Sequence, residues 1–194
     1  MDPNELTHLH YAEARGGIRD GDLLLCRGWS LMSRLIRLGG QSPYSHAGMA
    51  AWRDGELRLL EVIAWHGGRE SSLLDWVIGE PAAWDVYAAN DDNAFPCFDR
   101  AAAVASMRQF VDQPYGWANV CGTSLLHLAG IRFFAWPNRN DLSTSTRPPF
   151  CSEAVARATR AGGVDPVRNL ADRYTEPHHL SESPFYDYRF TLIP

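Results

Sequence analysis

The sequence predicts a mixed fold of the α+β class, built on an antiparallel sheet. Two strand-like runs, residues 45–52 and 57–64, flank the turn signal RDGE at 53–56. Asp-Gly between two apolar runs is typical of a tight β-hairpin. Helical patterns follow in the second half of the chain, at residues 99–112 and 151–161. A local hairpin together with separate helices favours a sheet that is covered by helices.

Local signals define the other elements. The run DLLLCR reads as a buried strand, because it is apolar, short and preceded by the turn signal Asp20-Gly21. The stretch 99–112 begins with an aspartate and is rich in alanine, as helices are. The remaining expected elements are a helix at 31–38 capped by Ser30, a strand at 84–88, a helix at 119–130, a loop at 136–149, and a last strand, YRFTLI, in the tail.

Composition restricts the class of protein. The chain has 194 residues, of which 45% are hydrophobic and 21% charged, so we predict one globular domain over 1–194, with 1–15 as an arm or short helix. The net charge is −5 and no block of Lys and Arg occurs, so we expect no nucleic-acid partner. No apolar run approaches the ~20 residues that span a bilayer, so we expect no integral membrane segment. The polar N-terminus lacks the features of a secretory signal, which predicts a cytoplasmic protein.

The cysteines and the paired histidines give no sign of a metal. Cys26, Cys97, Cys121 and Cys151 form no C-x-x-C pair, which argues against a zinc ribbon. His8 with His10, and His178 with His179, lie near the two ends of the chain without acidic or cysteine ligands at the usual spacing. We therefore expect neither a metal nor a cofactor.

His46 stands out because it lies in the otherwise apolar stretch SPYSHAGMAAW. The hairpin pairs Arg53 with Glu56, and the same register carried along the strands puts Gly48 opposite Glu61. Since side chains alternate between faces, His46 and Glu61 then share a face as diagonal neighbours, roughly 7–8 Å apart at the backbone. A carboxylate beside an imidazole fixes its tautomer and stabilises its charged form.

The pairing alone leaves two interpretations open. Glu61 is either the partner of His46 or a strand residue that faces solvent on the same side. A slip of one residue in register would place the two side chains on opposite faces. His66 is an alternative partner of His46, although its side chain would point to the opposite face of the sheet if the strand continued that far.

Cys151 is the first candidate for a nucleophile beside such a pair, since the chain has no G-x-S-x-G motif. It lies where the proline-rich segment RPPF enters a helix, and the N–H groups and dipole of a helix N-terminus favour a thiolate. A buried helix cysteine without a chemical role would look the same. Among the other cysteines Cys121 is the best rival, because it could also open a helix.

Five stretches, in this order, resemble the YiiX/YebB-like group of NlpC-type cysteine hydrolases: GDLLL, SPYSHAGMA, LRLLEV, QPYGW and PFCSEAVARA. These hydrolases are circularly permuted relatives of papain, and lecithin retinol acyltransferase shares their order of motifs. The resemblance implies a permuted papain-like fold, in which the helix of the cysteine packs against a central antiparallel sheet. It also implies that Cys151 is the nucleophile, His46 the base and Glu61 the third member of a catalytic triad.

The resemblance further implies hydrolysis of an amide bond through a thioester acyl-enzyme, with a cell-wall peptide as the expected substrate. A lipid acyl hydrolase or acyltransferase using the same triad, and a non-catalytic binding module, are the alternatives. We expect Tyr44 and Ser152 to contribute to the oxyanion or substrate site. A wall substrate would require delivery by another route than a signal peptide, such as a phage particle, a holin or a secretion system.

Overall fold

The computed structural model describes residues 7–28, 42–79, 82–91, 95–116, 147–168 and 170–194. The helices expected at 31–38 and 119–130, and most of the loop expected at 136–149, lie outside these residues. No helix among the described residues has both the length and the apolar character that a membrane span requires.

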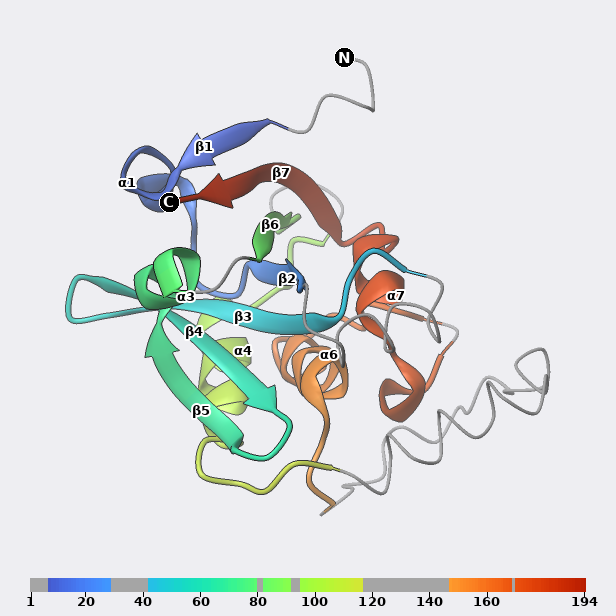
Figure 1. Ribbon diagram of the computed structural model, residues 1–194. Coiled ribbons are helices and arrows are strands. Elements are labelled where there is room, and N and C mark those ends of the chain that lie inside the picture. The colour runs from blue at the N-terminus through green and yellow to red at the C-terminus, as the bar shows by residue number, and fades with distance from the viewer. Residues whose placement is uncertain (1–6, 29–41, 80–81, 92–94, 117–146, 169) are drawn as a thin grey trace.

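A seven-stranded sheet forms the centre of the described structure, in the order β1-β7-β6-β2-β3-β4-β5 (Figure 1). Neighbouring strands are antiparallel, except that β1 and β7 are parallel. The strands are β1 His8–His10, β2 Leu23–Arg27, β3 His46–Arg53, β4 Glu56–Ile63, β5 Gly67–Ser72, β6 Ala83–Ala89 and β7 Tyr186–Ile193. The α+β class with a mainly antiparallel sheet is therefore confirmed.

Helices cover both faces of the sheet. The helices are α1 Tyr11–Ala14, α3 Leu73–Gly79, α4 Arg100–Arg108, α6 Cys151–Ala161 and α7 Pro177–Ser181, with short 3-10 turns η1 Arg15–Gly17 and η3 Asp172–Tyr174. One apolar core joins the sheet to α4, α6 and α7, and contains Met49, Leu60 and Val155. A second core on the opposite face joins the sheet to α1 and α3, and contains Leu59, Leu73 and Trp84.

The β3–β4 hairpin has the predicted register. Asp54 and Gly55 both have positive φ, 52° and 80°, as a two-residue turn of this type requires. Arg53 then pairs with Glu56, and the pairing continues to Gly48 opposite Glu61.

The strands expected at 22–27, 45–52, 57–64 and 84–88 and the final strand are all present, and the helix expected at 151–161 is α6. The helix expected at 99–112 is α4, which begins at a capping bond from the Ala102 N–H to Asp99 but ends at Arg108. Residues 8–10 of the expected arm form β1 against the last strand.

β5 is absent from the sequence-based prediction because its residues, GGRESS, lack an apolar alternation. Tertiary contacts make this segment a strand. Gly68 exchanges backbone hydrogen bonds with Gln113 and Asp112, and a side chain at Gly68 would collide with the carbonyl of Phe110. The strand therefore depends on glycine for a close approach to the chain that follows α4.

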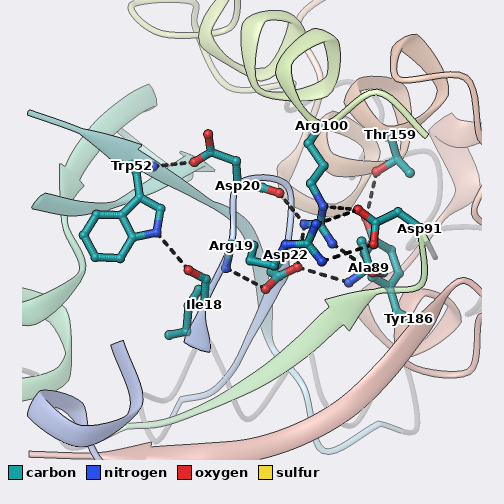
Figure 2. A network of polar contacts seen from close by, with 10 residues as sticks. All are labelled: Ile18, Arg19, Asp20, Asp22, Trp52, Ala89, Asp91, Arg100, Thr159 and Tyr186. Carbon is teal, nitrogen blue, oxygen red and sulfur yellow. Dashed lines mark hydrogen bonds and ion pairs between the residues drawn. The ribbon is translucent and has the colours of Figure 1, made fainter. Parts of the chain in front are cut away.

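Arg100 of α4 ties the helix to one end of β2 and β6 through a buried polar network (Figure 2). Its Nη1 lies 2.8 Å from a carboxylate oxygen of Asp22, and its Nε pairs with Asp91. The Ala89 N–H also donates to Asp22, whose side chain is buried. Because a buried carboxylate is stable only with such partners, the network fixes how α4 sits on the sheet.

Candidate functional site

Cys151 is the first residue of α6, at the end of an extended segment that contains two prolines. Phe150 precedes it in an extended conformation, and its N–H donates to a carboxylate oxygen of Glu153 at 3.4 Å. Glu153 is fully buried and also pairs with Arg157, one helical turn further on. These contacts fix the first turn of α6, and they place the Cys151 side chain at the open N–H groups of the helix.

The Cys151 thiol is buried and hydrogen-bonded to the imidazole of His46. The backbone N–H groups of Ala47 and Ser152 also donate to the sulfur. Burial alone would raise the pKa of this thiol, but the hydrogen bond and the charge of His46, with the two N–H donors, outweigh burial and lower it. These surroundings therefore stabilise the thiolate form of Cys151 relative to that of a free thiol.

His46 is held between Cys151 and Glu61. Its Nε2 lies 2.6 Å from Oε2 of Glu61, which leaves the other ring nitrogen for the thiol. The ring also meets Trp84 edge to face, with ring centroids 6.3 Å apart. Burial disfavours the charged ring, yet the hydrogen bonds and charges of Cys151 and Glu61 raise the pKa of His46 to about 10.

The end of the β3–β4 ladder brings these side chains together. The paired part of the ladder stops at Gly48 and Glu61, two residues beyond His46, and the Ala47 N–H there bonds to the sulfur on α6. A Cβ atom at Gly48 would lie 2.4 Å from the side chain of Leu59 and 3.0 Å from the carbonyl oxygen of Leu60, so a larger residue would require Leu59 to move. The predicted register thus accounts for the contact between His46 and Glu61.

Arg69 is a member of the site that the sequence did not reveal. It pairs with Glu61 in the β4–β5 ladder, and its Nε donates to Oε1 of Glu61 at 2.9 Å. Burial alone would raise the pKa of Glu61, but His46 and Arg69 together hold it below the ordinary value. Sequence analysis could not find Arg69 because it did not predict strand β5. Only the pairing of β5 with β4 places Arg69 opposite Glu61.

Tyr115 is a second residue to which sequence analysis gave no role, although it lies in the quoted motif QPYGW. Burial and the negative charges of Cys151 and Glu153 raise the pKa of its hydroxyl, which shows how near it is to the thiol. The neighbouring Gly116 donates its N–H to the carbonyl of Pro149 at 3.0 Å. The QPYGW segment is therefore fastened to the segment that leads into α6.

Tyr44 and Ser152 do not point at the thiol. The Tyr44 hydroxyl is buried, donates to Asp85 at 2.9 Å and lies 2.7 Å from the hydroxyl of Tyr87. Tyr44 precedes β3, so the alternation of a strand does not carry it to the face of His46. The Ser152 hydroxyl donates to the carbonyl of Thr175, and this residue reaches the sulfur only through its backbone N–H.

The alternative candidates lie elsewhere. His66 is exposed in the turn between β4 and β5. Cys26 is buried opposite His46 on β2, and Cys97 is exposed in the segment before α4. Cys121 lies outside the described residues.

A group of metal-ligand type residues lies around α7. Glu176, His178 and His179 each offer a donor atom within 4.8 Å of the others, and all are half-buried. The sequence-based argument missed Glu176 and took the histidines as exposed. In the structure, Nδ1 of His179 accepts the N–H of Glu176 at 3.0 Å, and Nδ1 of His178 lies 3.2 Å from a Glu176 oxygen. The His179 ring thus serves as the cap of this short helix.

Comparison with known proteins bears on the fold. No protein-family model matches the sequence. No curated protein matches it either. Among solved structures, the chain is similar to the crystal structure of the metalloprotein YiiX from Escherichia coli O157:H7, with a TM-score of 0.62 and 14% sequence identity over 91% of this chain and 99% of that one. The chain therefore has a YiiX-like fold, in agreement with the group that its motifs resemble.

Proposed function

We propose that the protein is a thiol hydrolase of the permuted papain type, with Cys151 as nucleophile, His46 as acid and base, and Glu61 as the third member of the triad. The hydrogen-bonded series from the Cys151 thiol through His46 to Glu61 carries the proposal, because it joins three side chains from a helix and two strands. A charged imidazole beside a thiolate at a helix N-terminus is the arrangement that thiol nucleophiles require.

The reaction would begin when the Cys151 thiolate attacks the carbonyl carbon of the substrate. The backbone N–H of Ser152, already directed at the sulfur, and the N–H of Cys151 are the nearest candidates to bind the developing oxyanion. His46 then gives its proton to the leaving nitrogen as the carbon–nitrogen bond breaks, and a thioester remains on Cys151. Water attacks this thioester, loses a proton to His46, and releases the acid and the free enzyme.

We further propose an amide in a cell-wall peptide as the substrate. The motifs that resemble NlpC-type hydrolases support this choice, and the YiiX-like fold is compatible with it. A fatty-acyl ester or amide would use the same steps, so substrate assays have to separate the two classes.

The metal implied by the description of YiiX is not part of the proposal. The donor set available for it here is Glu176, His178 and His179. Because Nδ1 of His179 accepts a backbone N–H, the neutral ring carries its proton on Nε2, and neither nitrogen offers a free electron pair. Without His179 the group offers only Glu176 and His178, fewer ligands than the three or four that a zinc site takes, so it does not fit a metal ion as it stands.

Alkylation with iodoacetamide tests the thiol directly. At pH 6 we expect Cys151, although buried, to react at least about ten-fold faster than the exposed Cys97, because thiolate content sets the rate. Equal rates at the two cysteines would overturn the proposal of an activated nucleophile.

Substrate assays then identify the bond. Purified muropeptides and short acyl esters are incubated with the wild-type protein and with the Cys151→Ala variant. Release of new amino groups from muropeptides by the wild type alone supports the amide proposal. Turnover of esters alone would replace it with the acyl hydrolase, and turnover that survives in Cys151→Ala would exclude both.

A further inference from the structure

The two carboxylate oxygens of Glu61 have different partners. Oε2 faces His46 and Oε1 accepts the N–H of Arg69 Nε, while only 1% of the Glu61 side chain is exposed. A buried carboxylate is costly without opposite charge close by. Glu61 therefore faces two cationic side chains, of which only His46 can give up its proton during the proposed reaction.

This difference matters because His46 changes charge in the proposed reaction. When His46 gives its proton to a leaving group, the imidazole becomes neutral and no longer balances Glu61. An arginine guanidinium takes no part in proton transfer at ordinary pH. The guanidinium therefore remains as the counter-charge of Glu61 throughout the cycle.

Arg69 is itself held on several sides. Its guanidinium lies over the ring of Trp76 on α3, 4.7 Å from the ring centroid, and the Trp76 N–H donates to Ser71 at 2.9 Å. The preceding residue, Gly68, is fastened to the backbone of Asp112 and Gln113. A planar cation that stacks on one side and donates an N–H on another is a geometry that arginine supplies and lysine does not.

We propose that Arg69 is the positioning residue of the site, holding Glu61 ionised and correctly oriented so that His46 can alternate between its charged and neutral forms beside Cys151. The proposal rests on the proposed function, and it adds a fourth member to the proposed triad. The charged or titratable groups that contact this series among the described residues are His46 on β3, Arg69 on β5 and Cys151 on α6, together with the neutral hydroxyl of Tyr115, whose pKa is raised by burial and by the charge of Cys151.

The direction of the effect follows from charge. Loss of the positive charge at residue 69 makes both the Glu61 carboxylate and the Cys151 thiolate less stable. Both groups then take up a proton at higher pH. The rate of Cys151 alkylation falls at low pH as the thiolate takes up a proton, and this fall is the acid limb of its pH profile. The acid limb should therefore move to higher pH by about 0.5–1 unit.

The experiment measures the rate of Cys151 alkylation by iodoacetamide between pH 4 and pH 9 in four proteins: wild type, Arg69→Gln, Arg69→Lys and Arg53→Gln. The last variant removes an exposed arginine at the far end of β3, which pairs with Glu70 and not with Glu61. We expect the acid limb to shift in Arg69→Gln, to return close to its wild-type position in Arg69→Lys, and to stay unchanged in Arg53→Gln. The thermal midpoint of each variant is recorded alongside, since a purely structural role would lower the midpoint and leave the limb in place.

The outcomes separate this inference from the proposed function, because alkylation requires no turnover. A reactive Cys151 whose acid limb is the same in folded Arg69→Gln overturns the role of Arg69 and leaves the hydrolase standing. A shifted acid limb in Arg69→Gln, when the wild type turns over neither muropeptides nor esters, supports the positioning role of Arg69 and overturns the proposed hydrolase activity. A wild-type Cys151 that reacts no faster than Cys97 overturns both. If Arg69→Gln does not fold, Arg69→Lys decides. An acid limb at the wild-type pH together with slower alkylation of Cys151 supports the positioning role of Arg69. Alkylation of Cys151 at the wild-type rate overturns it.

Discussion

Nε2 of His46 lies 2.6 Å from Oε2 of Glu61, across the end of the β3–β4 ladder. The pKa of Glu61 is lowered, which favours its charged form beside the imidazole, and Glu61→Gln removes this charge while keeping the shape of the side chain. We expect the rate of Cys151 alkylation at pH 6 to fall by about ten-fold, which corresponds to a shift of one pKa unit. The matched control is Glu56→Gln, an exposed glutamate on the same strand. A variant that alkylates at the wild-type rate would show that Glu61 plays no part in activating the thiol.

The Cys151–His46 pair predicts an unusual dependence of stability on pH. Between pH 6.5 and 9, the unfolded chain holds its one proton on the thiol. Wherever the folded pair is thiolate and imidazolium, it also holds one proton, on the imidazole, whose pKa is raised to about 10 while that of the thiol is lowered. Both states then bind the same number of protons, so this pair adds no slope to the free energy of unfolding.

The variant Cys151→Ala removes this compensation. His46 still faces Glu61, and a histidine whose folded pKa is raised stabilises fully below pH 6.5 and loses its contribution as the pH rises. Urea titrations from pH 6 to pH 9 should show the free energy of unfolding falling by up to about 1.4 kcal/mol per pH unit relative to wild type. The double variant Cys151→Ala/His46→Ala should lose that extra slope. Parallel curves for wild type and Cys151→Ala would contradict the assigned charge states.

Arg100 and Arg19 both pair with Asp91, but Arg100 is much less exposed. Its side chain is 13% exposed, against 54% for Arg19, and it also neutralises Asp22. Arg100→Met should lower the free energy of unfolding by about 3 kcal/mol, because it leaves a carboxylate buried without a cation. Arg19→Met should cost less than about 1 kcal/mol. Equal losses, measured by urea unfolding, would show that burial does not determine the strength of this network.

Gly116 tests the link between the QPYGW segment and the start of α6. A Cβ atom there would lie 2.3 Å from the carbonyl oxygen of Pro148 and 2.8 Å from the carbonyl carbon of Pro149. Gly116→Ala should push this segment away and misplace Cys151, with a loss of about 10- to 100-fold in turnover, as small misplacements of reacting groups produce. Gly17→Ala, whose Cβ meets nothing within 4 Å, is the control and should retain activity. Full activity in Gly116→Ala would show that the position of the QPYGW segment does not affect the placement of Cys151.

Most of the sheet and the main contact of the site could be predicted, because the signals involved are local. Asp54-Gly55 determines the turn, the turn determines the register, and the register places Glu61 near His46. The boundary of α6 at Cys151 followed from the prolines before it and the glycines after it.

Arg69 and Tyr115 could not be predicted, because their positions depend on contacts between distant segments. β5 is polar and rich in glycine, and it becomes a strand only through β4 and the residues after α4. Tyr44 was expected at the oxyanion or substrate site, but it lies just before the start of β3 and its hydroxyl bonds to Asp85. Pattern rules fail where a strand begins or where tertiary contacts override local preference.

The parallel pair β1–β7 and the late position of α6 have a consequence for biosynthesis. His46 and Glu61 emerge from the ribosome early, whereas Cys151 lies in a helix that can dock only after about three quarters of the chain has been made, and the last strand to appear, β7, pairs with the first. Until α6 docks on the sheet, the Cys151 thiol has no imidazole beside it. The contact between the thiol and the imidazole therefore forms late in synthesis, well after the hairpin that carries His46 and Glu61 has been made.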